Sequence, residues 1–281
     1  MAQDSLSLSG KVAIITGSGK ENGIGAGIAL ALARAGAKVT INYVSPSTAE
    51  RTVKTVDIIE TAAGKDSVLV IQADISTPEG NEKLVKGTLK GFNVDHIDII
   101  GVYNIHLTES MELMFAVNNA SWVYFGPALA ASTADLHQAF GTGVFGPLYL
   151  LQAAMPYMSK GGRVINIGSI ASKLGLREGP IYASVKGAMD ALTFSLAHEI
   201  GRAGKGLTIN TVAPGPVLTD MLSMDDPDTE AFTKYLVSLT RAEDRLGTVE
   251  DIADTVLLLV SEKGRWITGQ HISASGGITG G

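Results

Sequence analysis

Short apolar runs alternate with helical stretches along the chain, and this alternation limits the possible folds more than any other feature. The runs are rich in β-branched residues and lie at 11–16, 37–43, 66–74, 96–100, 162–168 and 207–213, with a last one near 271–275. Helical stretches follow the first three runs at 26–36, 47–63 and 79–91, and Ser47 is the expected N-cap of the second. Buried strands alternating with helices predict a parallel sheet covered on both faces. We find no linker or repeat, so we expect one doubly wound α/β domain of about seven strands over residues 1–281.

Composition excludes several classes of function. The net charge of −6 disfavours binding to nucleic acids or anionic membranes. There are no cysteines, so disulfides and thiol catalysis are excluded, and the five histidines lack metal-ligand spacing, so no metal is expected. The polar N-terminus has no signal-peptide core, and no apolar run approaches the roughly 18 residues of a spanning helix. We therefore expect a cytoplasmic enzyme.

A glycine-rich turn lies between the first apolar run and the first helix. Gly17, Gly23 and Gly25 would let the backbone approach a pyrophosphate, whose charge is favoured by the N-terminus of the following helix. The alternative is a turn that only requires positive φ. Because the glycines lie in the required strand–turn–helix context, we favour a dinucleotide site.

The end of the second run, Asn42 to Ser45, indicates which dinucleotide is bound. A carboxylate at this point would bind the ribose 2′-hydroxyl of NAD, and none is present. Lys20 and Arg34 are cations within reach of a 2′-phosphate, which favours NADP(H) over NAD(H). For Arg34 the alternative is a solvated cation at a helix end, where the helix dipole stabilises it.

A Ser, Tyr and Lys lie near the carboxyl end of the fifth run. Ser169 follows the strand pattern directly, and Tyr182 and Lys186 are spaced i and i+4, so they lie on one face of a helix. A phenol with a pKa of roughly 10 is a poor proton shuttle at neutral pH, and a nearby ammonium lowers that pKa. A hydroxyl can hold a substrate oxygen while Tyr passes the proton. The alternative is a half-buried Tyr beside a Lys whose ammonium reaches solvent.

Taken together, these residues resemble the short-chain dehydrogenase/reductase family over most of the chain. The sequence TGSGKENGIG (16–25) is similar to its TGxxxGxG loop with two extra residues, VNNA (117–120) to its NNAG motif, and ITGQHISASGG (267–277) to its last strand. The resemblance implies a Rossmann fold and the catalytic residues Ser169, Tyr182 and Lys186. It also implies these cofactor-binding residues: Gly17, Lys20, Gly23, Ile24, Gly25, Arg34, Asn42, Ser45, Asp74, Ile75, Asn118, Ala120, Tyr182, Lys186, Pro214, Gly215, Val217 and Thr219.

Two of these residues have more specific roles by resemblance. Asp74, in ADI (73–75), is placed to accept from the adenine amino group, and Thr219 is placed to contact the cofactor's carboxamide or phosphates.

The resemblance also implies an activity. The stretch ALARAGAKVTINY (31–43) is similar to fungal NADPH-dependent naphthol reductases, which implies reduction of a ketone or oxidation of a secondary alcohol, with an aromatic or polyketide-type metabolite as substrate. Family members are usually homotetramers, so a homo-oligomer is expected. Two alternatives stay open: an NADP(H)-binding protein without redox turnover, and a non-redox enzyme such as a dehydratase or cyclase.

The chain departs from the family pattern in three places. Gly143 occupies the position of a fourth catalytic residue, an Asn that helps to relay protons, and Ser121 replaces the usual Gly after NNA. The third departure is an insertion at 101–116, which interrupts the expected HIDIIVNNA. It is either an excursion or lid over the site, or a translated intron whose excision would restore HIDIIVNNAS in frame.

The segment 221–246 lies where the family has its variable substrate lid. Its apolar residues indicate either a pocket wall or the core side of an amphipathic helix. These residues are Met221, Leu222, Met224, Phe232, Tyr235 and Leu236. We interpret the nearby cluster of Asp225, Asp226 and Asp228 as a solvated helix start.

Overall fold

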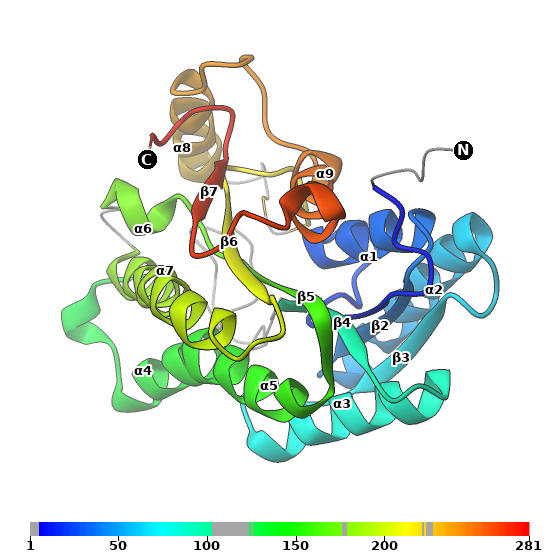
Figure 1. The fold of residues 1–281 in the computed structure, drawn as a ribbon. Coiled ribbons are helices and arrows are strands. Elements are labelled where there is room, and N and C mark those ends of the chain that lie inside the picture. The colour runs from blue at the N-terminus through cyan, green and yellow to red at the C-terminus, as the bar shows by residue number, and fades with distance from the viewer. Residues whose placement is uncertain are drawn as a thin grey trace.

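A parallel sheet forms the centre of the molecule (Figure 1). The computed structural model describes residues 6–102, 124, 126–175, 179–220, 222 and 227–280. Within these ranges the sheet has seven strands: β1 (Val12–Ile15), β2 (Lys38–Tyr43), β3 (Val68–Gln72), β4 (Ile97–Val102), β5 (Met158–Ile167), β6 (Thr208–Pro214) and β7 (His271–Ala274). Their order is β3-β2-β1-β4-β5-β6-β7, and all neighbouring pairs are parallel. The predicted doubly wound fold is confirmed.

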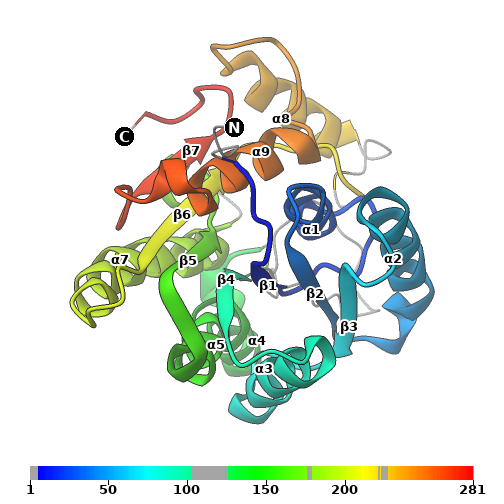
Figure 2. The same ribbon diagram turned by 45° about the vertical axis from the view of Figure 1, so that its right-hand side comes forward.

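Helices cover both faces of this sheet (Figure 2). Their bounds are α1 (Ile24–Arg34), α2 (Ala49–Ala63), α3 (Pro78–Phe92), α4 (Thr133–Phe140), α5 (Gly146–Ala154), α6 (Ala171–Leu174), α7 (Pro180–Gly201), α8 (Pro227–Ser238) and α9 (Val249–Val260). Short helical turns are η1 (Pro46–Thr48), η2 (Ala128–Ala130), η3 (Gly141–Phe145), η4 (Met155–Tyr157) and η5 (Glu262–Gly264). Helix α1 packs against α2 and α9 on one face, and α3, α5 and α7 lie on the other.

The two hydrophobic cores explain why the strands appear in the sequence as continuous apolar runs. All four residues of β1 are buried. Ile15 packs with Ile28 and Leu32 of α1, whereas Ile14 packs with Leu84 of α3 on the opposite face. Successive side chains of a strand point to opposite faces, so a strand covered on both faces is apolar at every position.

The start of α2 corrects one prediction. Ser47 is not its N-cap, because residues 46–48 form the turn η1, in which Ser45 Oγ accepts a hydrogen bond from Ser47 N at 3.3 Å. Helix α2 then begins at Ala49 without a side-chain cap. The helix predicted at 79–91 is α3, which begins one residue earlier at Pro78 and has Thr77 as its N-cap.

The strand order reverses between β1 and β4. Strands β1 to β3 extend the sheet in one direction, and β4 to β7 extend it in the other. Ligands of such sheets bind outside the carboxyl ends of the strands, at the reversal point. The glycine-rich turn after β1 and the segment containing Ser169 after β5 both lie at this edge.

Strand β4 continues beyond the stretch expected from the sequence. Gly101 and Val102 pair with Ile165 and Asn166 of β5, so the first two residues of the predicted insertion belong to the sheet. The remainder of 101–116 and the VNNA motif with Asn118, Ala120 and Ser121 lie outside the described residues.

The predicted substrate lid is described only in part. Met221 and residues 223–226, which include Met224, Asp225 and Asp226, lie outside the described residues. Helix α8 occupies the middle of the segment. Across the described ranges, every helix is too short or too polar to cross a bilayer.

Candidate active site

The structure brings Ser169, Tyr182 and Lys186 together. Ser169 lies two residues beyond the end of β5, and the other two lie in the first turns of α7. Their exposed fractions are 4%, 2% and 4%. The Ser169 side chain lies close enough to the Tyr182 phenol to lower its pKa, and Lys186 Nζ lies 5.6 Å from the centre of the Tyr182 ring. Lys186 therefore does not extend to solvent, and its Nζ donates to the Ile167 carbonyl at 2.9 Å.

Burial controls the charge of both titratable groups. It raises the pKa of Tyr182 to about 12, and the Ser169 side chain only partly opposes this shift. Burial also lowers the pKa of Lys186 to about 8, while the charge of Asp190 opposes that shift. The sequence predicted that the ammonium would lower the Tyr182 pKa, but burial raises it, and the opposing contribution comes from Ser169. The phenol is therefore protonated at neutral pH and is ready to donate a proton.

The glycine-rich turn has the backbone conformation that close approach to a phosphate requires. Gly17 has φ of 60°, in the left-handed region that favours glycine. Gly23 is the N-cap of α1, so no side chain caps this helix, and Ile24 and Gly25 form its first turn. The first N–H groups of a helix attract anions, which makes this turn suitable for a pyrophosphate.

Asn42 holds the strand ends beneath this turn. Its Oδ1 accepts from Gly17 N at 3.3 Å, and its Nδ2 donates to the carbonyls of Ile71 and Ala73, both at 3.0 Å. The side chain is fully buried. Asn42 therefore links β1, β2 and the end of β3, and shapes the cofactor site from below.

A cavity of about 200 Å³ lies beside the turn, at the end of β2. Its lining residues are Gly17, Gly19, Lys20, Asn42, Tyr43, Val44, Ser45, Ser47, Thr48 and Arg51. The pKa of Lys20 is lowered, first by burial and then by the charge of Arg51, so the two cations are close. Two cations and two serine hydroxyls suit a 2′-phosphate.

Arg34 does not belong to this cavity, which corrects a prediction. It lies in the last turn of α1, and the next residue, Ala35, accepts at its carbonyl from Leu8 N, which precedes β1. The helix of 11 residues carries Arg34 about 16 Å from the glycine-rich turn, to the opposite edge of the sheet. Arg51, in the first turn of α2, is the arginine that lines this cavity. It was not singled out from the sequence, because it lies beyond the end of β2 in the following helix.

Arg51 also ties the glycine-rich turn to the segment after β6. Its Nε donates to Glu21 at 2.7 Å, and its guanidinium contacts Asn22 and Asp220. Asn22 contacts Asp220 as well. Glu21 and Asn22 belong to the turn that is two residues longer than the family pattern, so the longer turn supplies this connection.

The remaining predicted residues lie along the same edge. Asp74 Oδ1 accepts from Ser76 N at 2.9 Å, just beyond β3, and Ile75 beside it is buried. Pro214 ends β6 and is followed by Gly215, while Val217 and Thr219 are 7% and 8% exposed.

Gly143 is buried within η3, a π-helical turn between α4 and α5. In the family this position lies within a helix, and here that helix is interrupted, because α4 ends at Phe140 and α5 begins at Gly146. Gly141 and Gly143 lie in the interruption, and glycine weakens the interior of a helix. Residue 143 has no side-chain amide for a proton relay.

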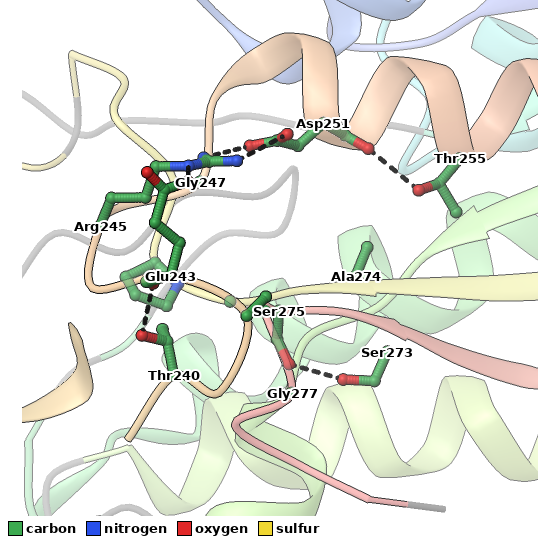
Figure 3. Close-up of a pocket in the computed structure, with 14 residues that line it drawn as sticks. Thr240, Glu243, Arg245, Gly247, Asp251, Thr255, Ser273, Ala274, Ser275 and Gly277 are labelled. Atoms are coloured by element: carbon green, nitrogen blue, oxygen red, sulfur yellow. Dashed lines mark hydrogen bonds and ion pairs between the residues drawn. The ribbon is translucent and has the colours of Figure 1, made fainter. Parts of the chain in front are cut away.

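A second cavity, of about 400 Å³, lies between the ends of β6 and β7 and the start of α9 (Figure 3). Arg245 reaches into it, where Asp251 and Glu243 accept hydrogen bonds from its guanidinium. These carboxylates offset its charge, so the cavity does not resemble the cationic site beside Lys20.

Comparison with known proteins identifies the family. A family model described as enoyl-(acyl carrier protein) reductase (adh_short_C2) matches residues 17–279. The short-chain dehydrogenase/reductase FrzI of a Cladobotryum species is 34% identical over 280 residues, which cover 97% of each chain. The tetrahydroxynaphthalene reductase PfmaG of Pestalotiopsis fici is 32% identical over 278 residues, which cover 95% of this chain and 91% of the relative.

A solved structure supports the same family assignment. The blue fluorescent protein from a metagenomic library, crystallised in complex with NADPH, has a TM-score of 0.80 and 32% identity, over 98% of this chain and 100% of that chain. The match extends from the glycine-rich turn to the last strand and includes the elements that hold Ser169, Tyr182 and Lys186. The protein therefore belongs to the short-chain dehydrogenase/reductase family.

Proposed function

We infer that this protein uses NADPH to reduce a ketone, with Tyr182 as the proton donor. The observation that carries this proposal is the buried cluster of Ser169, Tyr182 and Lys186 at the carboxyl edge of the sheet. Ketone reduction needs a group that gives up a proton, whereas alcohol oxidation needs a group that takes one. Because the pKa of Tyr182 is about 12, the phenol carries its proton at neutral pH, which favours the reductive direction.

The described residues fit NADP(H). Gly17 in the left-handed conformation and the uncapped start of α1 suit the pyrophosphate. The cavity with Lys20, Arg51 and Ser45 suits the 2′-phosphate. By resemblance to the family, Asp74 and Ile75 would contact the adenine. The same resemblance gives Pro214, Gly215, Val217 and Thr219 as contacts of the nicotinamide half, and Asn118 and Ala120 would complete the site. The bound cofactor would supply the hydride.

The side chains of the cluster divide the remaining work. The Ser169 hydroxyl orients the substrate carbonyl, and Tyr182 donates its proton to the carbonyl oxygen. Lys186, as an ammonium fixed by the Ile167 carbonyl, stabilises the phenolate that proton transfer leaves behind. Burial of all three makes this electrostatic interaction stronger than it would be in water.

We propose an aromatic or polyketide-type ketone as the substrate. Similarity to a tetrahydroxynaphthalene reductase supports an aromatic ring system. In the lid segment, Leu222 and Leu236 are 7% and 5% exposed and pack into the protein, whereas Tyr235 is 58% exposed and available for contacts. Family resemblance supports a homo-oligomer, which light scattering would test.

The test is oxidation of NADPH by the purified protein against aromatic and aliphatic ketones and quinones, with NADH in parallel. We expect turnover of at least one aromatic ketone with a preference for NADPH. Tyr182→Phe should retain NADPH binding and lose turnover by a factor on the order of 10²–10⁴. Binding of NADPH without turnover of any ketone would contradict the proposal.

One observation favours a second candidate, an NADP(H)-binding protein without redox turnover. Gly143 in its π-helical turn supplies no amide for the family's proton relay. In that case NADPH would bind, and the NADPH absorbance would stay constant with every ketone. Tyr182→Phe would then bind NADPH as the native protein does, and neither protein would oxidise it. Product formation without NADPH consumption would instead indicate dehydration or cyclisation.

A further inference from the structure

A carboxylate lies directly behind the catalytic lysine. Asp190 is one helical turn beyond Lys186 on α7, and residues four apart share a helix face. Asp190 Oδ1 is buried and has no hydrogen-bond partner in the described part of the chain. A Cβ added to Gly168 would lie 3.5 Å from this oxygen, so the carboxylate packs against the backbone that immediately precedes Ser169.

Two side chains from other elements lie beside the second oxygen of Asp190. Ser172 Oγ, on α6, donates to Oδ2 at 2.7 Å, and His271 Nδ1, on β7, lies 3.1 Å from Oδ2. Ser172 Oγ also lies 3.0 Å from the Ser169 carbonyl, but its single hydroxyl hydrogen can serve only one acceptor, and the carboxylate is the nearer of the two. The carboxylate thus joins α6, α7 and β7 behind the active site.

The charged and titratable groups around Asp190 show which of them its carboxylate can stabilise. On its own helix the nearest titratable groups are the Lys186 ammonium and, one turn further, the neutral Tyr182 phenol. On α6 the only cation within the described residues is Lys173, which is exposed. Strand β7 contributes His271, and the ends of β5 and β6 contribute uncharged groups such as Gly168 and Thr211. Lys186 Nζ binds the Ile167 carbonyl and Asp190 Oδ1 lies beside Gly168, so the two buried charged groups approach neighbouring residues of the same stretch of backbone.

We propose that Asp190 is a positioning residue that keeps the catalytic Lys186 protonated at working pH, with the Ser172 hydroxyl holding the carboxylate in place. A fully desolvated ammonium strongly favours losing its proton, and an anion one helical turn away opposes that loss. Burial lowers the pKa of Lys186, and the charge of Asp190 opposes that lowering. The kinetic consequence rests on the reductase function proposed above, but the protonation of Lys186 does not.

The test compares Asp190→Asn with the native protein by direct titration of Lys186. Asn keeps the size and an oxygen that accepts from Ser172, and it removes only the charge. The titration uses NMR of protein labelled with ¹³C at lysine Cε, with Lys186→Arg to assign the signal. We expect the titration midpoint of Lys186 to fall by about one pH unit or more. The alkaline limb of kcat/KM for ketone reduction should move to lower pH by the same amount.

Two further variants make the result specific. Asp190→Glu restores the charge, so the Lys186 titration should return toward that of the native protein. Glu199→Gln removes an exposed carboxylate from the same helix, so neither the titration nor kcat/KM should change. An unchanged Lys186 titration in Asp190→Asn would overturn the proposal. Absence of ketone turnover in the native protein would overturn only the reductase function, because the NMR titration still reports on Asp190.

Discussion

Arg51 offers the sharpest test of cofactor recognition, because only one cofactor carries the 2′-phosphate. Arg51→Gln removes a guanidinium from the cavity that also contains Lys20. Hydrogen bonds to charged groups contribute about 1.5–3 kcal/mol. The Arg51 side chain is 29% exposed and already contacts Glu21 and Asp220, so the lower part of that range applies. We expect the Kd for NADPH to rise about 10–30-fold.

The assay is fluorescence titration with NADPH and NADH, because the ratio of the two affinities isolates the phosphate contact. Loss of the tie to Asp220 would weaken both cofactors equally, so Asp220→Asn should leave the ratio unchanged. Arg34→Gln is the matched control, since Arg34 lines a different cavity, and it should change neither affinity. Equal weakening of NADPH and NADH in Arg51→Gln would refute the phosphate contact and leave Arg51 only its structural role.

Other predictions concern stability, the insertion and pH. Asp98→Ala removes the acceptor of three hydrogen bonds that join the starts of β1, β4 and β5, and should lower the free energy of unfolding in urea by about 3 kcal/mol. If 101–116 is a translated intron, the mature transcript lacks these codons, and the protein without these residues should have a higher Tm and retain turnover. Lys186→Met should abolish turnover yet raise the free energy of unfolding at pH 7 by about 1–2 kcal/mol. The lowered pKa of Lys186 corresponds to a cost of roughly 3 kcal/mol for burying the ammonium, which the variant removes. The expected gain is smaller because Asp190 loses its counter-charge. That gain should fade as pH rises from about 8 to 10.5, where the folded and then the unfolded lysine lose their protons. Ketone reduction by the native protein should fall as pH rises through about 8.

The fold could be read from the sequence because the central strands are covered on both faces. Every position of β1 is buried, so the strand appears as an unbroken apolar run, and the glycine-rich turn marks where the first helix begins. The i, i+4 spacing of Tyr182 and Lys186 is also local, so a helix brings them together without knowledge of the rest of the chain.

Contacts between distant elements could not be read in the same way. Arg34 and Arg51 flank the same strand in sequence, yet α1 carries the first to the far edge of the sheet while α2 begins beside the phosphate cavity. His271 meets Asp190 only because β7 lies beside β6 at the sheet edge. Such pairs depend on the register and direction of elements, which apolar periodicity does not specify.

The depth of burial is the other quantity that sequence does not give, and here it sets the chemistry. In water a tyrosine with a pKa of 10.0 would ionise before a lysine with a pKa of 10.5, whereas burial gives values of about 12 and 8 and reverses that order. Below about pH 8 the site therefore holds a neutral phenol beside an ammonium, and the ion pair forms only when Tyr182 has given its proton to the substrate. The ammonium then stabilises the new phenolate within a dry site, where the attraction is strongest. Above about pH 8 the lysine becomes neutral and the phenolate would form without a counter-charge, so the reaction should slow although the proton donor is still present.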